Sequence, residues 1–157
     1  MAKAQGIWLC TAESITAGAL GAELAKTPGA SGSFLGGVIS YQDQVKSQLL
    51  GVSPMLIENQ TAVDPEVAAQ MADGARSKFA RANVLDSDKV LAIATTGVAG
   101  PESVGNHGPG VVYIALASRL GVKVYAEQFQ GSREEIVNAT VERGILLIGE
   151  ELQALQG

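Results

Sequence analysis

The feature that most constrains the fold of this chain is an alternation of short apolar runs with longer amphipathic stretches. Apolar runs at residues 6–12, 34–41 and 89–100 have the length and composition of buried strands. Stretches with helical periodicity lie between them. Because parallel strands need a long crossover between them, this order predicts an α/β fold with a mixed, mainly parallel sheet that helices cover on both faces.

Capping and turn residues locate the other expected elements. Ser and Asp cap helices well, and Pro is favoured at the first helical position. The expected helices lie at residues 15–26, at 42–52, after the Ser53-Pro54 pair, after the Asp64-Pro65 pair, and after Ser132, which forms a capping box with Glu135. The apolar runs 110–116 and 122–129 predict a hairpin that turns at residues 118–121.

Length and charge exclude several classes of protein. With 157 residues the chain is expected to form a single domain over residues 1–157. Its net charge of −5 and its dispersed Lys and Arg residues argue against nucleic acid as a partner. No apolar run approaches the roughly 18 residues of a membrane span, and no secretory leader is recognisable. We therefore expect a cytoplasmic protein with no membrane partner, and the low charge and the glycines of the second strand favour a homo-oligomer.

The scarcity of cysteine and histidine limits the chemistry. Cys10 and His107 are the only residues of their types. An internal disulfide, a cysteine-based zinc cluster and a two-histidine metal site are therefore excluded. We expect no metal or cofactor, and a catalytic base other than histidine.

Three polar segments follow the predicted parallel strands, at residues 11–18, 40–46 and 95–110. Loops at the carboxyl ends of strands carry the ligands in sheets of this kind. In the first segment, Ser14 has two interpretations: it caps the following helix, or it acts as a nucleophile near the positive helix end. Without histidine, a nucleophilic serine needs a lysine or tyrosine base with a lowered pKa.

The second segment offers both kinds of base. Tyr41 ends the second strand and Lys46 follows on the short helix. Taken alone, a tyrosine at a strand end is more typical of a packing anchor, and a lysine on a short helix is more typical of a solvated side chain. The third segment has glycines that could surround a phosphate or a flat ring, or could simply form a tight loop.

Taken together, the three segments resemble a known family. The stretches "TAESITAG", "PGASGSFLGGVISYQDQVKSQLLGV", "TTGVAGP" and "GPGVVYIAL" are similar, in this order and spacing, to the C-terminal-domain family of the competence/damage-inducible protein CinA. Its stand-alone members are nicotinamide-nucleotide amidases. The resemblance implies a three-layer α/β/α fold and hydrolysis of nicotinamide mononucleotide to nicotinic acid mononucleotide and ammonia, in pyridine-nucleotide salvage.

The resemblance also implies roles for individual residues. Ser14 would attack the carboxamide carbon, and Lys46 would accept and return the proton of the serine hydroxyl. Tyr41 would relay this proton or orient the reacting groups. Backbone N–H groups at the start of the first helix would hold the oxyanion. The expected substrate-binding residues are Thr16, Gly97, Gly100 and Arg133, with Arg133 holding a phosphate.

Several positions depart from the family pattern. Ile15 replaces a cysteine, Glu102 and Ser103 replace glycines of the third segment, and Val137 replaces a second arginine. The intact Ser14, Tyr41 and Lys46 favour an enzyme. The altered loop favours the alternative, a nucleotide-binding or interaction module that keeps the fold without turnover.

Overall fold

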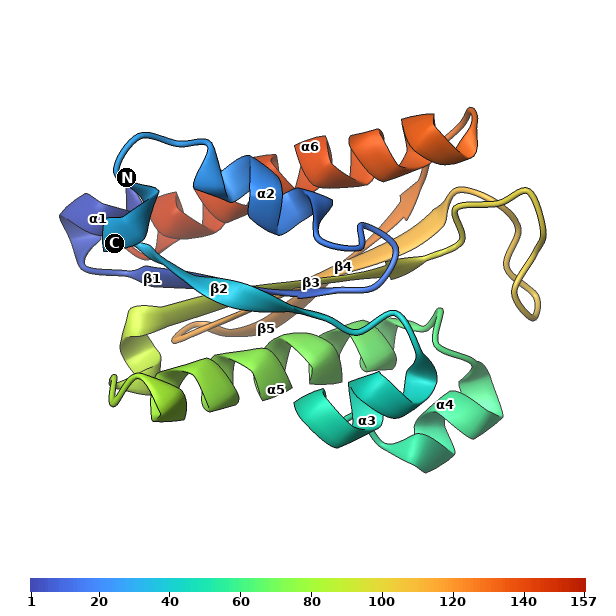
Figure 1. Cartoon of the computed structure of the whole chain (residues 1–157), viewed down its shortest axis with the longest axis horizontal. Helices are drawn as coiled ribbons and strands as arrows, with labels where there is room; N and C mark the ends of the chain where they lie inside the picture. Colours follow the sequence, from blue (N-terminus) through green and yellow to red (C-terminus); the bar gives the residue numbers. More distant parts are fainter.

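The computed structural model describes residues 1–157 as one sheet between two helical layers (Figure 1). The strands are β1 (Trp8–Glu13), β2 (Phe34–Ile39), β3 (Val90–Gly97), β4 (Val111–Ser118) and β5 (Gly121–Gln128). The helices are α1 (Ala2–Gln5), α2 (Ala19–Ala25), α3 (Asp43–Leu50), α4 (Pro54–Gln60), α5 (Pro65–Ala82) and α6 (Arg133–Ala154), with the 3₁₀ turns η1 (Ala30–Gly32) and η2 (Ser87–Lys89). The three-layer α/β/α prediction is confirmed.

The sheet has the strand order β2-β1-β3-β4-β5. Strand β1 is the second strand of the sheet, and it pairs in parallel with the edge strand β2 on one side and with the central strand β3 on the other. Strands β4 and β5 form the predicted hairpin, and β4 pairs antiparallel with β3. The carboxyl ends of β1, β2 and β3 therefore meet at one edge of the sheet, as the expected site requires.

The two faces of β3 are covered differently. Leu91 and Ile93 belong to the apolar core beneath α2 and α6, whereas Ala92 and Ala94 belong to the core beneath α5. Figure 1 shows α2 and α6 together on one face of the sheet and α5 with α3 and α4 on the other. All four side chains are at most 1% exposed, so β3 is a central strand buried on both faces, as its uninterrupted apolar sequence predicts.

The expected caps are confirmed at three helices. The side chain of Ser53 accepts from Leu56 N at the start of α4, and Asp64 accepts from the first amides of α5. Ser132 and Glu135 form the predicted capping box of α6. These three helices begin where the capping signals predict.

The prediction of the first helix is wrong at the N-terminal end of that helix. We expected a helix over residues 15–26, but α2 spans only Ala19–Ala25, with Gly18 as its N-cap at φ 99°. Residues 14–18 form a turn instead, in which Ala17 also has a positive φ of 46°. The short α1 was not predicted from the sequence. None of the helices combines the length and apolar character that a membrane span requires.

Candidate active site

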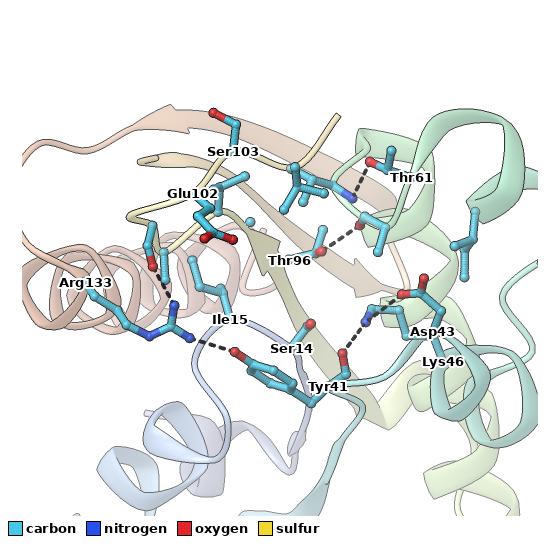
Figure 2. Close-up of a pocket in the computed structure, with 18 of the residues that line it drawn as sticks. Ser14, Ile15, Tyr41, Asp43, Lys46, Thr61, Thr96, Glu102, Ser103 and Arg133 are labelled. Atoms are coloured by element: carbon cyan, nitrogen blue, oxygen red, sulfur yellow. Dashed lines mark hydrogen bonds and ion pairs between the residues drawn. The ribbon is translucent and has the colours of Figure 1, made fainter. Parts of the chain in front are cut away.

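A cavity of about 710 Å³ opens at the carboxyl edge of the sheet. Its size lies within the range of small-molecule sites, roughly 300–1,000 Å³. All three polar segments contribute to it (Figure 2). Of the seven residues expected in the site, the cavity is lined by Ser14, Tyr41, Lys46, Gly97, Gly100 and Arg133.

Ser14 comes directly after the end of β1. Its backbone N–H donates to the carbonyl of Thr95 at 2.9 Å, which continues the pairing of β1 with β3 by one residue. The side chain is 9% exposed and lines the cavity, and its hydroxyl makes no hydrogen bond within the chain. Figure 2 shows the hydroxyl in the middle of the labelled residues, between Tyr41 and Thr96. Ser14 is therefore held by its backbone while its oxygen stays free for a ligand.

The capping role weighed for Ser14 belongs to Glu13 instead. The Glu13 carboxylate is 1% exposed and accepts hydrogen bonds from the backbone N–H groups of Gly18 at 2.9 Å, Leu20 at 3.0 Å and Gly21 at 2.7 Å. The hydroxyls of Thr11 and Thr16 also donate to it. A buried carboxylate thus occupies the positive end of α2.

This arrangement limits where the expected oxyanion site can lie, because the helix predicted from residue 15 begins only at Ala19. The amides at the start of α2 cannot hold a substrate oxygen, because Glu13 already accepts from them. The backbone N–H groups of Ile15 and Thr16, in the turn directly after Ser14, donate no hydrogen bond within the chain. Buried amides without an acceptor are uncommon, and both residues are at most 6% exposed.

The expected substrate contact of Thr16 is also corrected. Its side chain is 2% exposed and does not line the cavity. The hydroxyl lies 2.7 Å from the Glu13 carboxylate and 2.8 Å from the hydroxyl of Thr95. Thr16 therefore fastens the turn after Ser14 to β3, and only its backbone amide remains without a partner.

Lys46 is buried, so the solvated alternative is wrong. Its side chain is 1% exposed, and its Nζ donates to the carbonyl of Tyr41 at 3.1 Å and lies 3.7 Å from Oδ1 of Asp43. Burial lowers the pKa of Lys46 below its ordinary value of 10.5, and the Asp43 carboxylate opposes that change in part. The amine therefore loses its proton more easily than a lysine in water, as a base needs.

Asp43 was missed in the sequence. It precedes Lys46 by three residues on α3, and that spacing brings side chains together on one face of a helix. The same spacing could have indicated the pair.

Arg133, the first residue of α6, connects three parts of the site. Its Nη2 donates to the Tyr41 hydroxyl at 2.7 Å, and its Nη1 donates to the Gly100 carbonyl at 2.7 Å (Figure 2). Arg133 is itself exposed, so these two hydrogen bonds form at the solvent-facing side of the cavity. Tyr41 is 48% exposed, and this hydrogen bond fixes the direction of its hydroxyl.

The two expected glycines line the cavity for structural reasons that differ. A Cβ atom at Gly97 would lie 2.7 Å from Cγ2 of Val112 and 2.8 Å from the carbonyl of Val111, so only glycine allows β3 and β4 to pack this closely. Gly100 has a φ of +85°, which side chains with a Cβ rarely adopt. The tight-loop interpretation is therefore confirmed at these two glycines, and their contact with a phosphate or a flat ring stays a prediction.

Glu102 was seen in the sequence only as a departure from the family. It lines the cavity, and its carboxylate has no hydrogen-bond or ion-pair partner in the chain. Figure 2 shows this carboxylate directed into the space beside Thr96 and Ile15. No three His, Cys, Asp or Glu side chains come close enough together to hold a metal ion.

Fold and site together define a class: an α/β/α protein that presents a free serine hydroxyl and a buried lysine in a cavity at the carboxyl ends of its parallel strands. The family model described as the CinA C-terminal domain matches residues 1–152. The chain therefore belongs to the CinA C-terminal domain family, and the resemblance seen in the sequence is confirmed.

Relatives and solved structures agree with this assignment. A putative competence-damage inducible protein of Pediococcus pentosaceus is 42% identical over 149 residues, which are 94% of this chain and 34% of that protein. A CinA-like protein of Solibacter usitatus is 41% identical over 129 residues, 82% of this chain and 29% of that protein. The chain thus spans about a third of the length of these curated relatives.

The solved structures are nearer to this chain in length. The competence damage-inducible protein A of Klebsiella pneumoniae superposes with a TM-score of 0.86 at 28% identity, covering 96% of this chain and 89% of that one. The competence/damage inducible protein CihA of Agrobacterium tumefaciens gives a TM-score of 0.84 at 30% identity, covering 99% and 88%. The family fold extends over almost all of the chain.

Proposed function

We propose that this chain is an amidohydrolase that converts nicotinamide mononucleotide to nicotinic acid mononucleotide and ammonia. The observation that carries the proposal is the combination of a free Ser14 hydroxyl and the buried Lys46 in one cavity, without a histidine. Membership of the CinA C-terminal domain family supports it, since stand-alone members that the sequence resembles are nicotinamide-nucleotide amidases.

The proposed reaction proceeds through a covalent acyl-enzyme. Ser14 Oγ attacks the carboxamide carbon while the neutral Lys46 Nζ accepts the hydroxyl proton. The tetrahedral intermediate expels the amide nitrogen, which takes that proton from Lys46 and leaves as ammonia. A water molecule then attacks the ester, with Lys46 again accepting a proton, and Ser14 recovers its proton when the carboxylic acid departs.

The oxyanion needs donors that no other group occupies. The backbone N–H groups of Ile15 and Thr16 meet that condition, because they follow the nucleophile directly and have no acceptor in the chain. Preorganised backbone donors of this kind stabilise the charge that develops on the carbonyl oxygen. We therefore assign the oxyanion to these two amides rather than to the start of α2.

The remaining residues orient the reactants. In this proposal Tyr41, held by Arg133, presents its hydroxyl to the substrate, and Gly97 and Gly100 form the wall against which the nicotinamide ring lies. No hydrogen bond joins Ser14 to Lys46 in this structure, so the Ser14 proton has no direct path to the amine in this geometry. Catalytic hydrogen bonds of this kind commonly tighten only when substrate binds.

The decisive experiment is ammonia release from nicotinamide mononucleotide by the wild type and by Ser14→Ala and Lys46→Met. We expect the wild type to be active and Ser14→Ala to lose at least about a thousandfold in turnover. Wild-type unfolding curves for both variants would exclude misfolding. Near-wild-type turnover by a folded Ser14→Ala variant would contradict the assignment of the nucleophile.

The second candidate is a module that binds the nucleotide without hydrolysing it. The missing hydrogen bond between Ser14 and Lys46 is the observation that favours it. Calorimetric binding of nicotinamide mononucleotide by a wild-type protein that releases no ammonia would support this candidate. Ammonia release that disappears with Ser14→Ala would eliminate it.

A further inference from the structure

The last strand of the sheet, β5, has an outer edge that pairs with no other strand of the chain. The strand order places β2 and β5 at the two edges of the sheet (Figure 1). Natural proteins commonly protect such edges with a proline, a bulge or a charged side chain, because the unpaired backbone groups can bond to a strand of another chain. β5 contains no proline, and it pairs with β4 without a register shift.

The hydrogen bonds between β4 and β5 show which residues of β5 present their backbone to the outside. Phe129 N donates to the Gly110 carbonyl at 2.9 Å, and these two residues extend the register of the hairpin by one pair. In an antiparallel pair, every second residue bonds to the partner strand and the residues between them point the other way. The odd-numbered residues of β5 therefore bond to β4. The even-numbered residues direct their N–H and C=O groups outward and form the outward row, which is Val122, Val124, Ala126 and Gln128.

The side chains of the outward row are uncharged and open to solvent. Val122 and Val124 are 44% and 37% exposed, and the other two residues of the row are exposed as well. The charged residues of β5, Lys123 and Glu127, lie on the opposite face of the sheet, where each forms an ion pair with α6. The edge therefore offers free backbone groups and apolar side chains, and no charge on it opposes a second strand.

The other edge of the sheet is less suited to pairing. Strand β2 has six residues against eight in β5, and an extra residue, Leu35, interrupts its register with β1. Gly36 follows at a φ of +131°. Irregularities of this kind twist an edge strand away from a partner.

We propose that β5 pairs with β5 of a second copy of this chain, antiparallel and across a two-fold axis, so that one sheet continues through both copies. A two-fold axis perpendicular to the sheet brings the same edge of both copies together and makes the two strands antiparallel. The interface of the expected homo-oligomer would then lie on β5 rather than on the glycine-bearing β2. This pairing is independent of the proposed amidohydrolase function.

Charge selects the register of the pair. Because the outward rows must face each other, an even-numbered residue opposes an even-numbered one. With Val124 opposite Ala126 of the second copy, Tyr125 lies on the axis and Lys123 lies opposite Glu127 twice. A shift by two residues separates these charges, and a shift by four places either Lys123 or Glu127 opposite itself, which is unfavourable. In the favoured register both side chains stay beside their α6 partners, so charges of alternating sign cross the interface.

The first test is the mass of the protein in solution. Light scattering should give about 32 kDa, twice the 16.1 kDa of one chain, at about 100 µM, where a dimer with a Kd of about 1 µM or tighter is mostly associated. Val124→Lys should give the mass of one chain with the wild-type circular dichroism spectrum, because it places a charge in the outward row. Ile39→Lys is the matched control on β2, where Ile39 is 56% exposed, and it should stay dimeric. A wild-type mass of one chain, or a folded Val124→Lys variant that remains a dimer, would overturn the inference.

Amide hydrogen exchange tests the same pairing in the wild type, without a substitution. The N–H groups of Val124 and Ala126 point away from β4, so only a second strand can protect them. We expect both amides to exchange slowly in the dimer and faster on dilution. Unprotected exchange at both positions would overturn the inference even if the mass is that of two chains.

Tyr125→Cys tests the register. A residue on the axis meets its own copy in a non-hydrogen-bonded pair with about 4.5 Å between Cα atoms, which a disulfide can span. Oxidation with diamide should link the two chains of this variant. The wild type should stay unlinked, because its only cysteine, Cys10, is fully buried. A dimeric Tyr125→Cys variant that does not link would contradict the register.

Discussion

Replacing Glu13 with glutamine should unfold the turn that holds Ser14. The carboxylate accepts five hydrogen bonds, three of them from backbone amides of residues 18, 20 and 21. A glutamine has one acceptor oxygen, and its NH₂ group would face donors. If the NH₂ group replaces Oε1, the amide of Gly21 loses its acceptor. If it replaces Oε2, the amides of both Gly18 and Leu20 do.

The smaller loss, that of the acceptor for the Gly21 amide, sets the expected change in the free energy of unfolding. A hydrogen bond to a charged group contributes about 1.5–3 kcal/mol, and an unsatisfied donor costs about 1–3 kcal/mol. We therefore expect Glu13→Gln to lower the free energy of unfolding by roughly 3 kcal/mol, a large part of the ~5–15 kcal/mol that stabilises a typical domain. Turnover should fall as well, because Ser14 and the amides of Ile15 and Thr16 belong to the same turn.

Urea unfolding followed by circular dichroism measures this change as a shift of the midpoint at constant slope. Glu23→Gln on α2 is the control, because Glu23 has an exposed ion pair with Lys26 and such pairs contribute at most about 1 kcal/mol. The reasoning is refuted if Glu13→Gln costs less than about 1 kcal/mol, or if it costs no more than Glu23→Gln.

Three further predictions concern the remaining charges and the assembly. Because Asp43 opposes the lowering of the Lys46 pKa, Asp43→Asn should lower that pKa further and move the rising limb of the kcat/KM pH profile to lower pH; a limb that stays in place or moves upward would contradict Lys46 as the base. Arg133→Lys and Arg133→Ala should both reduce kcat/KM for nicotinamide mononucleotide by about ten- to a hundredfold, because a lysine cannot reach Tyr41 and Gly100 at once or reproduce the guanidinium fork toward a phosphate; an unchanged KM in both variants would remove Arg133 from the site. The homo-oligomer stays a prediction, and a light-scattering mass of 16.1 kDa, that of one chain, would contradict it.

The sequence predicts the fold well because its signals are local and agree with one another. Pro54 and Pro65 follow capping residues, and the apolar runs have the length of strands, so α4, α5 and β3 begin close to where they are expected. The exception is α2. A helical periodicity starting at residue 15 does not reveal that Glu13 turns back to cap the helix at Gly18.

The site is predicted less completely, because burial and long-range contacts decide it. The sequence brings Ser14, Tyr41 and Lys46 to one edge of the sheet, yet it cannot tell that Lys46 is buried or that Thr16 points away from the cavity. The Arg133 contacts to Tyr41 and Gly100 join residues 92 and 33 positions apart. No spacing in the sequence indicates such pairs.

The hydrogen bonds of Arg133 have a consequence for how the site forms during folding. Ser14, Tyr41 and Lys46 lie in the first third of the chain, but the residue that orients Tyr41 begins the last helix. Contacts between distant segments form late, because closing a long loop costs conformational entropy before the contact repays it. Tyr41 therefore receives its orientation only after α6 has packed on the sheet, and a chain in which α6 is undocked keeps the nucleophile and the lysine without a finished pocket.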